Sequence, residues 1–199
     1  MSLRQQNKIR ARQQIIAAAE ALISEHGAAN TTTRAIAKQA GVSYQTLYNY
    51  FPNKAALMRE LLQEEFALWS RQVDGVLKAY DGDLIGSLLA ICELGIDILS
   101  GPKAELWNAI TQQLLAEPPD HAQYSALSTV AHEHCYALLN SALGMGQLRP
   151  DTDLHLMAHT LFSLCDYNLL MFHFMPIAKD QFLHTQRQQF ELVLNPYLT

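Results

Sequence analysis

Residues 43–50 hold hydrogen-bonding and aromatic side chains and no acid. The segment reads SYQTLYNY, and its polar or aromatic members are Ser43, Tyr44, Gln45, Thr46, Tyr48, Asn49 and Tyr50. Glutamine can pair with adenine through two hydrogen bonds, and threonine or tyrosine can contact the methyl group of thymine. A surface without acids also does not repel phosphates. We therefore predict that this segment binds double-stranded DNA, with Tyr44, Gln45 and Thr46 reading bases in the major groove.

Three residues outside this segment are candidates for holding the DNA backbone. Thr33 and Lys54 each stand where a helix is expected to begin, and free backbone amides and the helix dipole favour a phosphate there. Arg34 can reach either a phosphate or a base. The alternative is a plain three-helix subdomain whose polar face is only solvated. Three tyrosines within seven residues, on a face without acids, favour the DNA-binding interpretation.

Two short helices, predicted over 33–40 and 43–50, must position these side chains. Between them Gly41 permits the left-handed backbone of a tight turn, and the Ser43 hydroxyl can cap the second helix. Small and apolar residues are spaced to fix the angle between the two helices: Ile36, Ala37, Ala40, Val42, Leu47 and Phe51. This arrangement predicts a helix-turn-helix.

The rest of the chain also shows helical spacing, with apolar residues recurring every three or four positions between glycine and proline breaks. We predict an all-α protein with a three-helix head, a long connecting helix and a five-helix body. Gly27 is expected to end the first helix, which should bury Ile9, Ile15, Ile16, Ala19, Leu22 and Ile23, and Asn53 is expected to cap the fourth. The predicted domains are 1–53 for DNA binding and 54–199 for ligand binding and dimerisation. The nine predicted helices cover about 5–26, 33–40, 43–50, 54–80, 83–99, 102–117, 120–143, 152–174 and 179–198.

Charge is distributed unevenly along the 199 residues, whose net charge is −5. Residues 1–60 carry eight lysines and arginines against three glutamates, whereas the remainder carries six basic and sixteen acidic residues. A basic head on an acidic body fits a protein that meets DNA at one end only. No apolar run is long enough to span a membrane and no signal peptide precedes the head, so we expect a cytoplasmic protein. Cys92, Cys135 and Cys165 are expected to be free thiols.

Residues 9–57 resemble the DNA-binding domain of the TetR-type (tetracycline-repressor-like) bacterial regulators. The resemblance implies a homodimer that binds a palindromic operator, with Thr33, Tyr48 and Lys54 on phosphates. It places Tyr44, Gln45 and Thr46 on bases or backbone. The body resembles the family only in its helix number and in the turn GQLRPD at 146–151. The resemblance rests on Ile15, Ala18, Ala19, Leu22, Gly27, Thr32, Thr33, Ile36, Ala37, Ala40, Gly41, Val42, Ser43, Leu47, Tyr48, Tyr50, Phe51, Lys54 and Leu57.

The last two predicted helices carry more apolar surface than a small body can cover. The eighth is apolar on nearly every face from Leu161 to Phe174, and such a helix is buried on both sides. The ninth carries one stripe of Phe182, Leu183, Phe190, Val193, Leu194 and Tyr197. We predict that a second copy covers these helices, and the family resemblance implies a four-helix interface. The alternative is that both stripes serve the monomer core.

Isolated polar residues within apolar helices are candidates for binding a small-molecule effector. Glu93, Asp97 and Asp166 each interrupt an apolar run, and a buried carboxylate without a partner favours a cationic or hydroxyl-bearing ligand. The alternatives are solvent exposure for Glu93 and Asp97 and a hydrogen bond across the dimer for Asp166. Aromatic candidates for the same pocket are Trp69, Trp107, Phe162, Tyr167 and Phe172, of which Trp107, Phe162 and Tyr167 complete the predicted site.

Other functions find less support in the sequence. His155 and His159 lie one turn apart and His132 and His134 lie near Cys135, but no set of metal ligands is evident, and no metal or cofactor is expected. A redox switch at a cysteine is disfavoured because apolar surroundings keep thiols inert. No phosphate-binding glycine loop or nucleophile motif indicates an enzyme. The leading hypothesis is a repressor released by a ligand, and the alternative is an activator or a DNA-binding protein that recruits a protein partner.

Overall fold

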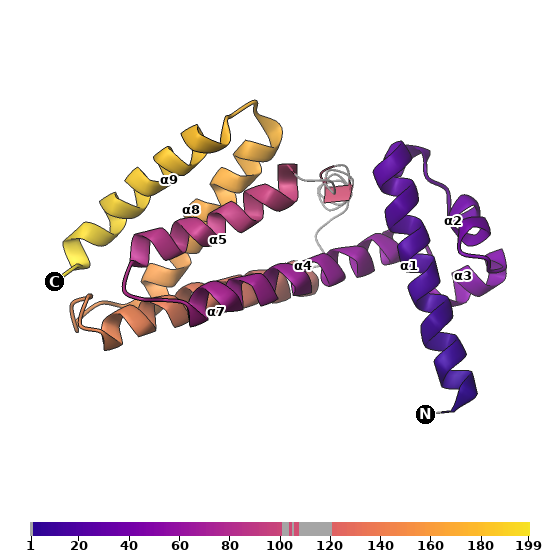
Figure 1. Cartoon of the computed structure of the whole chain (residues 1–199), viewed down its shortest axis with the longest axis horizontal. Coiled ribbons are helices and arrows are strands. Elements are labelled where there is room, and N and C mark those ends of the chain that lie inside the picture. The colour runs from indigo at the N-terminus through magenta and orange to yellow at the C-terminus, as the bar shows by residue number, and fades with distance from the viewer. Residues whose placement is uncertain (1, 101–103, 105, 108–120) are drawn as a thin grey trace. The chain divides into compact units, whose positions relative to one another are not determined.

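A computed structural model describes residues 2–100, 104, 106, 107 and 121–199, and its regular elements are helices (Figure 1). Within these residues the one extended pairing is an isolated antiparallel bridge between Leu148 and Leu198. The prediction of an all-α fold is confirmed. The elements are α1 (Leu3–Asn30), α2 (Thr33–Gln39), α3 (Tyr44–Tyr50), α4 (Lys54–Lys78), α5 (Leu84–Ser100), α7 (His121–Gly144), α8 (Leu154–Phe174), α9 (Lys179–Leu194) and the 3₁₀ helix η1 (Asn195–Tyr197).

The helix boundaries agree with the predicted ranges to within a few residues. The last helix is shorter than predicted: α9 ends at Leu194 instead of residue 198, and the chain continues as η1. Pro196 explains the difference, because it has no N–H to donate to the helical ladder. The helix predicted over 102–117 lies outside the described residues except at positions 104, 106 and 107.

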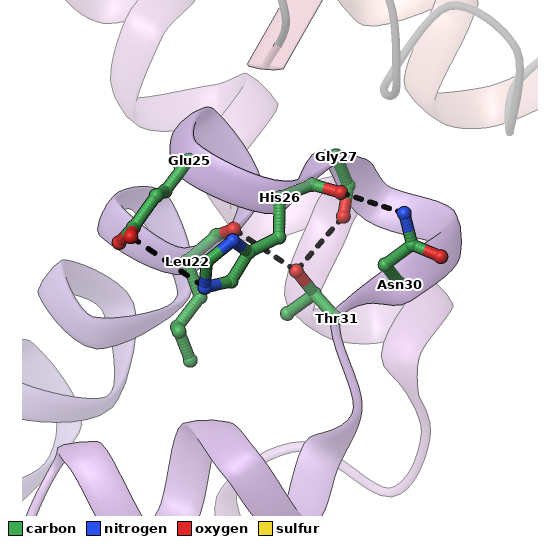
Figure 2. Close-up of polar contacts among 6 residues, drawn as sticks. All are labelled: Leu22, Glu25, His26, Gly27, Asn30 and Thr31. Carbon is green, nitrogen blue, oxygen red and sulfur yellow. Dashed lines mark hydrogen bonds and ion pairs between the residues drawn. The ribbon is translucent and has the colours of Figure 1, made fainter.

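Gly27 breaks α1, as the sequence predicts, but a further helical turn follows the break. Its φ of 75° lies in the left-handed region that favours glycine. The hydroxyl of buried Thr31 lies 3.1 Å from the Leu22 carbonyl and 2.9 Å from the Gly27 carbonyl, and the Asn30 amide donates to the His26 carbonyl (Figure 2). Because these bonds satisfy carbonyls that the break leaves free, they fix the direction in which the chain leaves α1 toward α2.

The first compact unit contains the chain up to Phe66 and, among the later described residues, 98–100, 104, 106 and 107. Its N-terminal part has an apolar core of its own. Residues of α1, α2, α3 and the first turns of α4 contribute to it, including Ile15, Ile16, Ala19, Leu22, Ile23, Ile36, Ala37, Leu47, Phe51, Leu57, Met58 and Leu61. The prediction that Ile9 is buried was wrong, since its side chain is 45% exposed. Residues 5–10 are all exposed, because the first turns of α1 extend past the helices that cover its later part.

A second compact unit contains Ala67–Asp97 and the chain from α7 onward. Its core includes Val73, Leu88, Cys92 and Ile96 from α4 and α5, together with apolar residues of α7, α8 and α9. Helix α8 packs against α7 and α9. Gly95 of α5 faces the Leu169 side chain of α8 so closely that an added methyl group would lie 3.0 Å from it. Among the described residues, no helix has the length and apolarity that crossing a membrane requires.

Candidate nucleic-acid interface

The turn between α2 and α3 has the local structure that the sequence predicts. Thr32 caps α2, because its side chain accepts a hydrogen bond from the Ala35 amide at 3.1 Å. Gly41 adopts a φ of +66°. The Ser43 hydroxyl then accepts from the Thr46 amide at 3.0 Å and caps α3. Ile36, Ala37 and Leu47 are buried where α2 and α3 pack together, so α3 keeps one face toward solvent.

Two tyrosines dominate the exposed face of α3. Tyr44 and Tyr48 are 47% and 49% exposed, and their ring centroids lie 6.4 Å apart. The Arg34 guanidinium of α2 lies over the Tyr44 ring, 5.8 Å from its centroid. This cation–π contact brings the predicted contacts of α2 and α3 onto one continuous surface.

Two further pairs of polar side chains form within α3 and at its start. The Gln45 amide donates to the Asn49 side-chain oxygen at 3.1 Å, and the Ser43 and Thr46 hydroxyls lie 2.8 Å apart. Gln45 is exposed, and its side-chain oxygen and second N–H remain available to a base edge. The pairing orients the amides before DNA binds, which reduces the conformational entropy lost on recognition.

A hollow of about 440 Å³ lies where the N-termini of α2 and α4 meet α3. It brings together three of the predicted backbone contacts, Thr33, Tyr48 and Lys54. Two lining residues, Thr32 and Asn53, were not among the predicted contacts, although each occupies a capping position that the sequence could have indicated. The full lining is Thr31, Thr32, Thr33, Tyr44, Leu47, Tyr48, Phe51, Pro52, Asn53 and Lys54.

Lys54 has a structural partner in addition to its predicted role. Its ammonium donates a hydrogen bond to the Ala28 backbone carbonyl in the last turn of α1. Burial lowers the pKa of Lys54, because desolvation disfavours the charged form. The cation is therefore held against the end of α1, on the wall of the hollow.

Tyr50 lies apart from the other predicted DNA contacts. Its hydroxyl donates to the Lys8 backbone carbonyl of α1 at 3.1 Å, and its side chain is half-buried. Arg12 of α1 is likewise occupied, since it forms an ion pair with Glu60 and lies over the Phe51 ring. These two side chains attach α1 to α3 and α4 in the structure.

The predicted effector residues in the body occupy different kinds of environment. Glu93 and Asp97 bind one cation, the Lys179 ammonium, at 2.8 and 2.7 Å, and these side chains are 40–59% exposed. This arrangement agrees with the exposed alternative for the two acids. Asp166 and Tyr167 are exposed on α8, whereas Phe162 packs against the core. The indole nitrogen of Trp107 is buried without a hydrogen-bond partner.

Apolar exposure in the body follows a different pattern from the one predicted. On α9, Phe182, Phe190 and Leu194 of the predicted stripe are buried in the monomer core. Four of the large exposed apolar residues of the body lie on α8, where Leu156, Tyr167, Leu170 and Phe174 are 63%, 60%, 36% and 53% exposed. Leu192 of α9 is 77% exposed. Within the described chain, no group of three or more potential ligands is arranged to hold a metal.

Comparison with known proteins agrees with this geometry. Residues 15–61 match the family described as "Bacterial regulatory proteins, tetR family". The nucleoid occlusion factor SlmA of Vibrio cholerae serotype O1 is 46% identical over 57 residues, which span 28% of this chain and only 29% of that relative. The similarity to SlmA therefore covers less than a third of either protein.

The fold of the whole chain has counterparts among solved structures. A TetR-family transcriptional regulator from Pectobacterium atrosepticum has a TM-score of 0.79 at 15% identity, covering 100% of this chain and 98% of the other. Thermus thermophilus FadR, a TetR-family transcriptional repressor in complex with lauroyl-CoA, has a TM-score of 0.68 at 24% identity, with 92% and 93% covered. The matched family consists of regulatory proteins, which confirms the prediction that the chain is not an enzyme.

Proposed function

We propose that the chain is a TetR-type repressor that binds a palindromic operator as a homodimer and leaves it when a small molecule binds. The match of residues 15–61 to the tetR family of bacterial regulatory proteins supports this proposal, as does the similarity in fold to a TetR-family regulator. The observation that carries the proposal is the acid-free face of α3 beside the hollow that contains Thr33, Tyr48 and Lys54. A regulator of this kind acts at the chromosome, so we place it in the cytoplasm. We keep residues 1–53 as the DNA-binding domain and 54–199 as the sensing and dimerisation domain.

In this proposal α3 enters the major groove with its N-terminal residues toward the bases. Gln45 reads a base edge with its free amide groups, and Tyr44 and Thr46 contact neighbouring bases. The hollow receives the phosphate backbone, where Thr33 and Tyr48 supply hydroxyls and Lys54 supplies positive charge. Arg34, held over Tyr44, reaches the same strand from α2.

The exposed stripe on α8 supports the dimer. Residues 156, 160, 163, 167, 170 and 174 are spaced alternately by four and three, the repeat with which two helices pack side by side. Four of these positions carry the exposed apolar side chains Leu156, Tyr167, Leu170 and Phe174. Thr160 and Ser163 between them are small enough for a close approach. A second copy that covers this stripe would set two heads at a fixed spacing, as successive major grooves about 34 Å apart require.

The effector is proposed to act by favouring a body conformation in which the two heads no longer fit the DNA. FadR of Thermus thermophilus, similar in fold, holds lauroyl-CoA. The alternative function is that of an activator, or of a DNA-binding protein that recruits a protein partner. The similarity of part of the chain to a nucleoid occlusion factor supports this alternative.

Retention of genomic DNA fragments by the purified chain tests the proposal. We expect a few fragments to be enriched and to share an inverted repeat. We also expect a chromatographic fraction of small metabolites, extracted from the bacterium that makes the protein, to release these fragments. Retention of fragments without a shared repeat would contradict the repressor. Release by no metabolite, combined with stable capture of a cellular protein on the bound DNA, would support the alternative.

A further inference from the structure

Two cysteines that lie far apart in the sequence meet in the body. Cys92 of α5 and Cys165 of α8 are separated by 73 positions, and their sulfur atoms lie 2.7 Å apart. Both are free thiols in the structure. We propose that Cys92 and Cys165 are a reversible disulfide pair, oxidised by hydroperoxides or similar two-electron thiol oxidants, that joins α5 to α8. The proposal concerns the body alone and does not depend on DNA binding.

The packing around the pair favours bond formation. A disulfide requires the two sulfurs to approach to about 2.05 Å, so only a small movement of the side chains separates the thiols from the bonded state. Gly95, one turn after Cys92, faces Leu169, one turn after Cys165, and its lack of a side chain lets the two helices come close together. Cys92 belongs to the buried core and Cys165 packs against it, so the surrounding side chains restrict both cysteines.

Exposure differs between the two cysteine residues. Cys92 is 1% exposed, whereas Cys165 is half-buried. Cys165 is therefore the residue nearer to solvent, and we take its sulfur, which is itself buried, as the one that a small peroxide reaches first when the packing around it opens. Its thiolate attacks one peroxide oxygen, which breaks the O–O bond, forms a sulfenic acid and releases an alcohol or water. The Cys92 thiol then displaces water from the sulfenic sulfur, so that two thiols lose two electrons and two protons as the peroxide is reduced.

The rate of this reaction should depend on pH. A hydrogen bond with Cys92 and burial both raise the pKa of Cys165 well above its usual value. A thiol with a raised pKa carries less of the reactive thiolate at neutral pH. We therefore expect slow oxidation at neutral pH that accelerates about tenfold per pH unit until the raised pKa is reached.

Cys135 supplies an internal control. It is buried, and desolvation raises its pKa to about 12. Cys135 is near enough to Cys165 for their charges to interact. It is therefore the cysteine that could compete with Cys92 for a disulfide bond to Cys165. It has no hydrogen bond to another sulfur among the described residues, and we expect it to remain a thiol.

The test is to treat the reduced full-length protein with hydrogen peroxide or diamide and to count thiols by alkylation and intact mass. We expect two of the three cysteines to disappear with the loss of two hydrogen atoms, and a peptide map to link Cys92 to Cys165 within one chain. Cys135→Ser should behave like the wild type, whereas Cys92→Ser and Cys165→Ser should not form the bond. The melting temperature of the oxidised protein should exceed that of the reduced protein by several degrees, because the bond closes a long loop.

Three results would overturn the proposal. One is that all three thiols of the folded protein persist at pH 8.5, although the same oxidant oxidises the urea-unfolded protein completely. The second is a link between Cys135 and Cys165, and the third is a link between two chains. If circular dichroism shows that a serine variant folds poorly, Cys92→Ala replaces it as the variant that cannot form the bond. The peptide map of the oxidised wild type identifies the linked cysteines without any variant.

Discussion

Tyr48 and Tyr50 stand two positions apart on α3 but serve different purposes at the scale of single residues. The Tyr48 ring is exposed beside the hollow, whereas the Tyr50 hydroxyl donates to the Lys8 carbonyl of α1. The sequence shows two tyrosines on either side of Asn49 and cannot separate these roles, because the partner of Tyr50 lies 42 positions away. Lys54 illustrates the same limit, since its bond to the Ala28 carbonyl depends on how α1 ends.

Removing each hydroxyl should separate the two roles. Tyr50→Phe should lower the free energy of unfolding by about 1 kcal/mol, because one hydrogen bond is lost, and leave the DNA affinity of the folded protein unchanged. Tyr48→Phe should weaken DNA binding several-fold and leave unfolding unchanged. Urea denaturation and fluorescence anisotropy with labelled DNA measure both quantities on both variants. Equal effects of the two changes on affinity would refute the assignment.

At the scale of elements, the helix-turn-helix could be predicted because local rules fix it. Thr32 and Ser43 are capping residues, and Gly41 permits the turn without any distant partner. Two other features could not be predicted, because they depend on tertiary packing between distant parts of the chain. The proximity of Cys92 to Cys165 and the pairing of Lys179 with Glu93 and Asp97 join positions 73 to 86 residues apart. The exposure of Ile9 depends on where the covering helices end.

A matched pair of glycine substitutions tests the turn. Gly41→Ala should destabilise the protein by about 1–2 kcal/mol, because alanine must adopt a left-handed conformation at that φ. Gly75→Ala, at an exposed position in the last turn of α4, should stabilise it by up to about 0.5–1 kcal/mol through the higher helix propensity of alanine. Neither added methyl group meets another atom within 4 Å, so both effects come from the backbone. Thermal unfolding in which Gly41→Ala matches the wild type would contradict this account of the turn.

At the scale of the whole molecule, function requires that two copies present their heads together. The α8 stripe carries the exposed apolar side chains for this contact, and α9 uses most of its own stripe within the monomer. The sequence indicates excess apolar surface on both α8 and α9. Only the packing of α9 within the monomer shows which apolar residues stay exposed and are free to contact a second copy.

Charges placed on the stripe should break the dimer. Leu170→Glu together with Tyr167→Glu would place carboxylates in an apolar interface, and the unpaired charges should raise the dissociation constant by at least a hundredfold. Asn140→Glu, on the exposed face of α7, is the control and should change nothing. Sedimentation equilibrium measures all three proteins. A double variant that stays dimeric would place the interface elsewhere.

The most direct test of base reading by α3 is selection of binding sites from random DNA by the wild type, Gln45→Ala and Gln39→Ala. Gln39 is an exposed glutamine of α2 outside the predicted contacts and serves as the matched control. We expect the wild type and Gln39→Ala to select the same inverted repeat, with half-sites about 34 Å apart. Gln45→Ala should lose preference at one symmetric position of each half-site, at a cost of about 1–3 kcal/mol for the best site. An unchanged selected sequence with Gln45→Ala, or no inverted repeat with the wild type, would contradict the account.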